Sequence, residues 1–423
     1  IVAICDVDEE RCNGSLKSFR EKYPEEAARQ ESAARFNDYR KMFDKLGNKI
    51  DAVTISTPDH MHFPAAMTAM SLGKHVYVEK PMTHTVWEAR QLTEKAREKK
   101  VITQMGNQGH ADEGCRILKE WVEAGVLGEV REVVSWTNRP FYPPWREPVG
   151  SFKKPDHSKF IPVVPKGVNW DAWLGVAKER EYDPCYMPWK WRGWWDFGAG
   201  ALGDMGCHIM DMPYWALGLT SPTTVEAVHE GGTAIAAPVW SKVTYQFPTS
   251  FLGGPVKFVW YDGVSPKEGV YRNPPPESLW KADFPTADHC FRRFDLLLVG
   301  EKGRMFFGRS RQDWIFKPDN LAANFTQPPK SIPRVAGSGE SAEGALDRGG
   351  GPYSEWIEAI RTGVPALSNF AQSGPFSETV LLGNVALRLG KRVEWDSQKL
   401  LVKNAPEAAP LIRRAYRKGW ELA

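Results

Sequence analysis

The chain has 423 residues, more than one ordinary hydrophobic core accommodates, so we expect two domains. Its apolar content of 42% and charged content of 25% are typical of a globular protein in water. A net charge of +3 without a basic block argues against a nucleic-acid partner, and no apolar run approaches the roughly 18 residues that span a membrane. The six cysteines are scattered and form no evident Cys/His ligand cluster, so we expect no metal site.

The chain opens on a short apolar run that ends in an acid, Asp6. This pattern is typical of a parallel strand buried on both faces, and in a dinucleotide-binding fold the acid at the end of the second strand holds the adenine ribose. No G-x-G-x-x-G turn precedes this strand in the chain. We therefore expect a further strand-turn-helix unit of about 20–40 residues or more upstream, together with any export signal. The compartment stays open between the cytoplasm and the periplasm.

Charged helical segments and β-branched strands alternate through the first quarter of the chain. We expect helices at Glu9–Lys22, from Pro64 to Gly73, and at Val86–Lys99. We expect strands at Ile50–Thr57, His75–Val78 and Val101–Met105. Strands separated by helices at this spacing predict an α/β domain with a Rossmann-like, doubly wound parallel sheet that lacks its first strand and Gly-rich turn.

The composition changes after an amphipathic helix at Cys115–Ala124. Residues 138–200 are rich in Trp, Pro and Gly and resemble long ligand-facing loops, and residues 318–351 form a second irregular stretch. We expect β-strands at Val130–Thr137, Thr223–His229, Trp240–Phe247, Pro255–Tyr261, Leu296–Val299 and Arg304–Phe307. We expect helices at 204–217, 353–361 and 377–389. The pattern predicts a nucleotide-binding domain over residues 1–110 and an α+β domain with an open sheet over residues 111–423.

Polar clusters follow the strands of the first half at the points where those strands end. In open α/β sheets ligands bind at this carboxyl edge, so we expect a dinucleotide there. The expected cofactor-binding residues are Asp6, Arg11, Thr57, Pro58, Asp59, His60, His62, Glu79, Lys80, Asn107 and Gln108. The carboxylate of Asp6 favours NAD over NADP because it repels a 2′-phosphate, although the nearby Arg11 weakens that preference. The spacing of His60 and His62 resembles a metal site only superficially, since no further ligand set accompanies them.

A second signal lies in the segment Gly203–Asp211. Asp204 and His208 are four residues apart, so on a helix they share one face, which Asp211 continues. A histidine is a natural base for the oxidation of a hydroxyl because its ordinary pKa lies near neutrality. The ammonium of Lys80 can donate to the same oxygen and stabilise a developing alkoxide. The alternative interpretation is a helix-capping aspartate, a packed histidine and a surface lysine.

The segments Val2–Asp8, Ser56–His62, Gly73–Pro81, Gly200–Asp211 and Gly390–Asp396 resemble the glucose-fructose oxidoreductase/inositol dehydrogenase/rhizopine catabolism family (Gfo/Idh/MocA). The resemblance implies an NAD(P)-dependent oxidoreductase of sugars or cyclitols, with Lys80, Asp204 and His208 as its catalytic residues. It also implies a second domain with an open, mostly antiparallel sheet that carries the substrate side and forms a homo-oligomer, a dimer or tetramer.

The loops before the helix that carries Asp204 offer candidate substrate residues. Polyols are bound by charged planar groups and by aromatic faces, and the alternative is a loop core filled with tryptophan. The expected substrate residues are His110, Arg192, Trp194, Trp195 and Asp211.

Three functions compete for this set of residues. The first is net oxidation of a sugar or cyclitol hydroxyl with NAD. The second is a glycosidase-type cleavage in which tightly bound NAD oxidises the sugar transiently, a glycosidic group is eliminated, and the hydride returns. The third is a binding protein that keeps the fold without turnover, against which the presence of Lys80, Asp204 and His208 argues.

Overall fold

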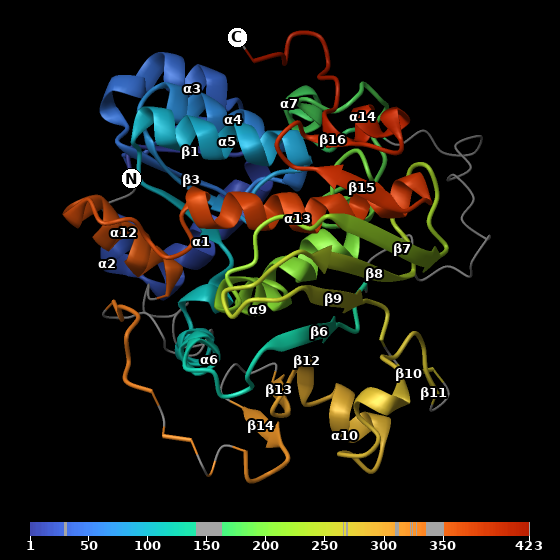
Figure 1. Ribbon diagram of the computed structural model, residues 1–423. Coiled ribbons are helices and arrows are strands. Elements are labelled where there is room, and N and C mark those ends of the chain that lie inside the picture. Colours follow the sequence, from blue (N-terminus) through green and yellow to red (C-terminus); the bar gives the residue numbers. More distant parts are fainter. Residues whose placement is uncertain are drawn as a thin grey trace.

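The computed structural model of the chain (Figure 1) describes residues 1–28, 32–140, 163–264, 266–267, 270–308, 313–321, 323, 325–326, 328–335 and 351–422. Parts of the predicted loop regions 138–200 and 318–351 therefore lie outside the described residues. Within the described residues, no helix combines the length and the apolar character needed to cross a membrane.

The first part of the chain folds into the expected parallel α/β layer. β3 (Ala52–Ile55), β4 (His75–Glu79) and β5 (Thr103–Gly106) form one parallel sheet, and β1 (Ala3–Cys5) pairs with β2 (Ala34–Phe36) in another. In the described residues no strand joins β1 to β3, which is the place of the first strand in the doubly wound order. The expected upstream unit stays a prediction.

The helices of this layer begin where their capping residues stand. α1 (Glu9–Lys22) and α5 (Val86–Lys99) have the predicted bounds, and the side chains of Asp8 and Thr85 accept bonds from their first turns. The remaining helices are α2 (Pro24–Ala28), α3 (Tyr39–Leu46), α4 (Asp59–Ser71) and α6 (Glu113–Glu123).

The predicted start of α4 at Pro64 is wrong, because Pro64 is the sixth residue of the helix and lies inside it. The helix begins at Asp59, directly after Pro58, where an acid is favourable beside the positive helix end. α13 (Phe370–Leu389) likewise begins ahead of its proline, Pro375, and is longer than the predicted segment 377–389.

The second part of the chain forms an open sheet of nine strands that is antiparallel except for the pair β6–β9. This mostly antiparallel sheet confirms the expected architecture. Its order is β14 (Trp314–Lys317), β13 (Arg304–Gly308), β12 (Phe294–Gly300), β6 (Val130–Trp136), β9 (Val256–Tyr261), β8 (Trp240–Phe247), β7 (Thr224–Glu230), β15 (Val393–Asp396) and β16 (Leu401–Val402). Outside it lie the hairpin β10 (Pro266–Lys267) and β11 (Val270–Tyr271) and the helices α7 (Trp170–Leu174), α10 (Ala287–Phe291), α12 (Pro352–Thr362) and α14 (Ala409–Ile412).

α13 crosses the middle of the molecule and ties the two layers together (Figure 1). On one side Glu378 accepts two bonds from Arg90 of α5, at 2.7 and 2.8 Å. On the other side Asn384 donates to the carbonyl of Ala199, which precedes a helical segment running from Gly200 to Ala216. The domain boundary at residue 110 stays a prediction, since α13 packs on both layers.

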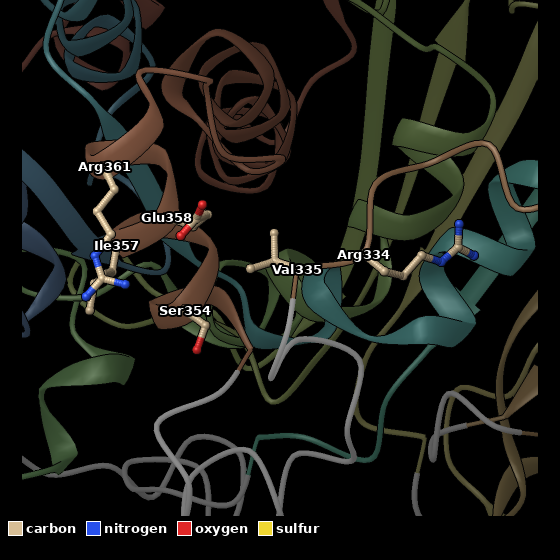
Figure 2. A pocket seen from close by; sticks show the side chains of 6 residues that line it. All are labelled: Arg334, Val335, Ser354, Ile357, Glu358 and Arg361. Carbon is tan, nitrogen blue, oxygen red and sulfur yellow. The ribbon is translucent and has the colours of Figure 1, made fainter.

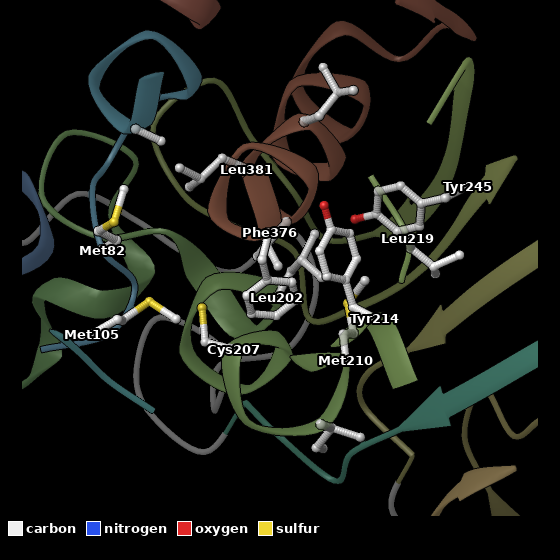
Figure 3. Close-up of a cluster of buried hydrophobic side chains, with 14 of the residues drawn as sticks. Met82, Met105, Leu202, Cys207, Met210, Tyr214, Leu219, Tyr245, Phe376 and Leu381 are labelled. Carbon is white, nitrogen blue, oxygen red and sulfur yellow. The ribbon is translucent and has the colours of Figure 1, made fainter. Parts of the chain in front are cut away.

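The helical segment 200–216 is anchored by its buried face. Leu202, Cys207 and Met210 pack in one apolar cluster with residues of α13 and with methionines next to β4 and β5 (Figure 3). The cluster includes Met82, Met105, Tyr214, Leu219, Tyr245, Phe376 and Leu381. Because interiors are packed as densely as crystals, this contact fixes the segment against the carboxyl edge of the parallel sheet.

Close packing of α13 on α5 predicts a cost for adding one carbon at Gly374. A Cβ there would lie 1.9 Å from the Thr93 hydroxyl oxygen, whereas a Cβ at Gly47, in a helical conformation, meets nothing within 4 Å. We expect Gly374→Ala to lower the free energy of unfolding by about 1–3 kcal/mol and Gly47→Ala to leave it unchanged or raise it. Thr93→Ala should rescue part of the loss in the double variant, as measured by thermal melts. Equal melting temperatures for the two single variants would contradict this packing.

Candidate active site

The segment from Gly200 to Ala216 is helical, with a π-helical turn at Leu202–Gly206 followed by α8 (Cys207–Ile209) and α9 (Asp211–Ala216). Such a turn inserts one extra residue and is often found at functional sites. Asp204 lies inside it and is buried, while His208 follows it and is half-buried. The letters of residues 198–203 match G-x-G-x-x-G, but they follow a loop instead of a β-strand and therefore lack the context of a dinucleotide turn.

Lys80 and Asp204 meet directly, although 124 positions separate them in the chain. Lys80 follows the last residue of β4, and its ammonium donates to the Asp204 carboxylate oxygen Oδ1 at 2.8 Å and to the Asp204 carbonyl at 2.7 Å. The Lys80 side chain is 15% exposed and that of Asp204 9% exposed. The fold thus joins the end of a parallel strand to the π-helical turn, as the sequence interpretation requires.

Three positive groups surround the carboxylate of Asp204. Besides Lys80, the Arg192 Nε lies 3.6 Å from Oδ1, and the Arg139 Nη1 lies 3.8 Å from Oδ2. Burial alone would raise the pKa of Asp204, but Lys80, Arg192 and His208 outweigh it and lower the pKa to about 2. Asp204 is therefore ionised at neutral pH and is a poor base. Arg139 was not predicted, because nothing in its local sequence distinguishes it from a loop arginine.

Asp59, predicted at the cofactor, begins α4 and is buried. Its carboxylate accepts a bond from the Ala199 N–H at 2.9 Å. Burial raises the pKa of Asp59 to about 7, although the charges of Lys80 and Arg192 act in the opposite direction. Asp59 therefore joins the first layer to the turn that leads into the π-helical segment.

His60 and His62, also predicted at the cofactor, point into the protein, and their rings contact backbone carbonyl oxygens. The ring of His60 lies between the carbonyls of Phe197 and Trp173, at 3.3 and 3.0 Å. The ring of His62 lies between the carbonyls of Thr57 and Pro81, at 2.8 and 2.7 Å. Burial lowers the pKa of His60 to about 3 and that of His62 to about 4, so both rings are neutral at pH 7. A direct bond from either ring to a cofactor stays a prediction.

The other predicted cofactor residues lie at strand ends or helix starts. Asp6 follows β1 and accepts a bond from the Asp8 N–H, and burial raises its pKa. Arg11 lies in the first turn of α1, where its N–H donates to Asp8. Thr57 and Pro58 lead from β3 into α4, and Gln108 begins a short 3₁₀ turn after β5.

Glu79 and Asn107 supply polar groups at the ends of β4 and β5 that suit a dinucleotide. Glu79 accepts a bond from Tyr353 at 3.3 Å, and its carboxylate lies over Gly106, where a Cβ would come within 2.7 Å of it. Asn107 is fully buried and accepts a bond from Ser368, yet its Nδ2 donor has no partner among the described residues. Buried donors are normally satisfied, so this amide fits a ligand acceptor at the sheet edge.

His110 and Asp211, predicted at the substrate, bond to each other at 2.7 Å in a buried position. Cys115 lies beside them, and the potential ligand atoms of these three residues are within 4.8 Å of one another. The sequence shows no such Cys/His set, because the three residues come from different segments and do not have metal-site spacing. The expected absence of a metal stays a prediction.

Among the three aromatic-loop candidates, Arg192 contacts Asp204, with its Nε 3.6 Å from Oδ1. Trp194 is buried, and its indole donates to the Cys185 carbonyl; Trp195 is buried, and its indole donates to the Thr233 carbonyl. Trp189 is 46% exposed beside Arg192.

A separate pocket of about 650 Å³ lies on α12 (Figure 2). The pocket is lined by Arg334, Val335, Ser354, Ile357, Glu358 and Arg361. None of these is a predicted site residue. Arg334 already pairs with Glu113 and Glu120 of α6. The pocket therefore carries no part of the candidate active site.

The sequence relatives of this chain include two dehydrogenases that match part of it. Levoglucosan dehydrogenase of Pseudarthrobacter phenanthrenivorans is 26% identical over 48% of this chain and 42% of its own length. An NAD⁺-dependent scyllo-inositol 2-dehydrogenase of Bacillus subtilis is 36% identical over 19% of this chain and 23% of its own length. The matched stretches thus span less than half the length of these curated relatives.

Among solved structures, the WlbA dehydrogenase of Bordetella pertussis, in complex with NADH and UDP-GlcNAcA, shares the fold. It aligns with a TM-score of 0.54 and 17% identity, over 94% of this chain and 90% of that one.

Family models agree with both parts of the fold. Residues 1–107 match an oxidoreductase family with an NAD-binding Rossmann fold, and residues 116–251 match the C-terminal α/β domain of the same family. The chain belongs to the Gfo/Idh/MocA family of oxidoreductases.

Proposed function

We propose that this protein oxidises a hydroxyl group of a sugar or cyclitol with NAD. The observation that carries the proposal is the bond between Lys80, at the end of a parallel strand, and Asp204, in the π-helical turn that leads to His208. The dehydrogenases among the relatives act on levoglucosan and scyllo-inositol by name, which agrees with this substrate class.

NAD, when bound, supplies the acceptor for the hydride that leaves the substrate carbon. Asp6, Glu79 and Asn107 would hold it along the carboxyl edge of the sheet. The carboxylate of Asp6 favours NAD over NADP, since it would repel a 2′-phosphate.

The chain's own residues divide the proton chemistry between them. Asp204 stays ionised and holds the Lys80 ammonium in place, because its pKa is lowered to about 2. Lys80 donates a hydrogen bond to the reacting oxygen and stabilises negative charge that develops there. His208, half-buried one turn beyond Asp204, accepts the hydroxyl proton.

Reduced-nicotinamide absorbance with a panel of sugars and cyclitols tests the proposal. Stoichiometric NADH supports net oxidation. Glycoside cleavage without NADH would indicate the redox-cycled route instead. The absence of both signals would favour a binding protein without turnover.

The base assignment predicts a specific loss on replacing His208. We expect His208→Asn to keep the fold and the affinity for NAD but to lower turnover by roughly 10²–10⁴, the usual contribution of a general base. His229→Asn, an exposed histidine on β7, is the matched control and should leave turnover unchanged. Near-normal turnover of His208→Asn would remove His208 from the mechanism.

The ion pair predicts a pH-dependent stability difference for Asp204→Asn. The pKa of Asp204 is lower in the folded protein, so its stabilising contribution is present above the ordinary pKa and is lost as pH falls toward about 2. We expect Asp204→Asn to lower the free energy of unfolding by about 2 kcal/mol at pH 7. The difference in this free energy between the variant and the wild type should narrow below about pH 4.

The matched control for this measurement is Asp171→Asn, which breaks an exposed pair with Arg417. It should change the free energy of unfolding by less than about 1 kcal/mol. Denaturant unfolding over a pH series measures both variants. A difference between Asp204→Asn and the wild type that stays constant down to the acid limit would contradict the lowered pKa.

A further inference from the structure

Asp204 carries one negative charge, and three cationic side chains lie around it. Lys80 takes Oδ1 at 2.8 Å, the distance of a charge-assisted hydrogen bond. Arg192 at 3.6 Å and Arg139 at 3.8 Å are too far for such a bond and interact with Asp204 only through space. The Arg192 guanidinium therefore stands at the site without a close bond to its buried carboxylate.

Arg192 keeps most of its hydrogen-bonding capacity. A guanidinium has five N–H donors in a planar fork. Within the part of the chain that the structure describes, Arg192 makes one hydrogen bond, from Nη1 to the Trp189 carbonyl at 3.3 Å, and its side chain is 25% exposed. A partly exposed fork of this kind suits a planar or tetrahedral anion, to which it can donate two parallel bonds.

Two tryptophans hold the Arg192 guanidinium at this position. It lies 4.3 Å from the ring centre of Trp191, which is buried, and 5.5 Å from that of Trp189, which is 46% exposed. The backbone of Arg192 is also fixed, because Gly198 packs on it so closely that a Cβ would lie 2.5 Å from its Cα. The exposed face of Trp189 offers an apolar surface of the kind on which a sugar ring stacks.

Asp59 is a second carboxyl group that interacts electrostatically with both Lys80 and Arg192. It is buried and already accepts the Ala199 N–H, and burial raises its pKa to about 7. It therefore carries only part of a negative charge at neutral pH and offsets the charge of the Arg192 guanidinium only in part.

We propose that the substrate is an acidic carbohydrate and that Arg192, with Arg139 beside it, binds its anionic group while the sugar ring faces Lys80. The inference rests on the proposed function, because it names the substrate class of the same site. A carboxylate and a phosphate ester are both anions that can accept two parallel hydrogen bonds from a guanidinium. The test therefore compares a uronate with a sugar phosphate.

Equilibrium binding to the NADH-loaded protein tests the anionic class without turnover. The ligands are glucuronate, its uncharged methyl ester, glucose and glucose 6-phosphate, measured by calorimetric titration. We expect glucuronate or glucose 6-phosphate to bind roughly 10- to 100-fold more tightly than the methyl ester and glucose, the usual worth of a charge-assisted hydrogen bond. Tighter binding of one anion identifies the carboxylate or the phosphate ester as the recognised group.

Variants then assign this preference to Arg192. Arg192→Gln should remove the preference for the anion and leave the affinity for the methyl ester within about 3-fold of the wild-type value. Arg192→Lys should keep part of the preference for the anion. Arg139→Gln, as a second variant, should also lower the affinity for the anionic ligand. Arg131→Gln is the matched control, since Arg131 is 64% exposed on β6 and pairs with Glu301.

Three results would overturn the inference. The first is equal affinity for glucuronate, its ester and glucose 6-phosphate. The second is an equal loss for charged and uncharged ligands in Arg192→Gln. The third is a loss of NADH affinity in Arg192→Gln with the sugar preference intact, which would assign Arg192 to the cofactor. Anion binding without NADH formation in the wild type would refute the proposed oxidation and leave the anionic class supported.

Discussion

The ion pair between Lys80 and Asp204 is the interaction on which the site depends. It joins the carboxyl end of a parallel strand to the π-helical turn of the second layer, and both side chains are largely withdrawn from water. Relative to a well-packed apolar pair, a buried ion pair contributes little net stability, because the cost of removing two charges from water offsets their attraction, whereas the loss of one partner alone destabilises the protein. Its position where the strand ends meet the helix therefore favours a role in chemistry over a role in holding the fold together.

The surroundings of this pair explain why it is held so firmly. The ring of His62 lies between the carbonyls of Thr57 and Pro81 and, being neutral, donates its one N–H to one of them; Pro81 directly follows Lys80. Asp59 bonds to Ala199, and Asn384 of α13 bonds to the same residue's carbonyl. The backbone on both sides of the pair is thus fixed by buried polar groups, and this kind of preorganisation makes a charged site effective.

Much of the fold could be predicted because its signals are local. The helices Glu9–Lys22 and Val86–Lys99 and the strand Trp240–Phe247 have the predicted bounds, since each has clear capping residues or alternation. The start of α4 was placed too late because Pro64 was taken as the first residue of a helix that in fact encloses it. The predicted segment 377–389 also began too late, since α13 starts at Phe370, ahead of Pro375. The π-helical turn leaves no local signature, since its extra residue is accommodated by packing.

The meeting of Lys80 and Asp204 agrees with the sequence interpretation, while the side chains around them were less predictable. Lys80 and Asp204 could be found from their motifs, but Arg139 could not, because only the fold brings the end of β6 to Asp204. The inward orientation of His60 and His62 depends on carbonyls of distant segments, and the burial of Trp194 and Trp195 depends on loops that the sequence does not order. Sequence spacing also could not show that Asp211 meets His110 and Cys115.

The most direct test of the account is the fate of the carbon-bound hydrogen. The protein is incubated with NAD and a mixture of carbon-deuterated hexoses, hexose phosphates, hexuronates and cyclitols and then quenched. The nicotinamide is analysed by mass spectrometry. We predict one deuterium in the reduced nicotinamide of the wild type and its loss in Lys80→Met. This readout detects both net oxidation and a transient oxidation on bound cofactor. Unlabelled nicotinamide in the wild type, or equal labelling in Lys80→Met, would contradict hydride transfer at the Lys80–Asp204 site.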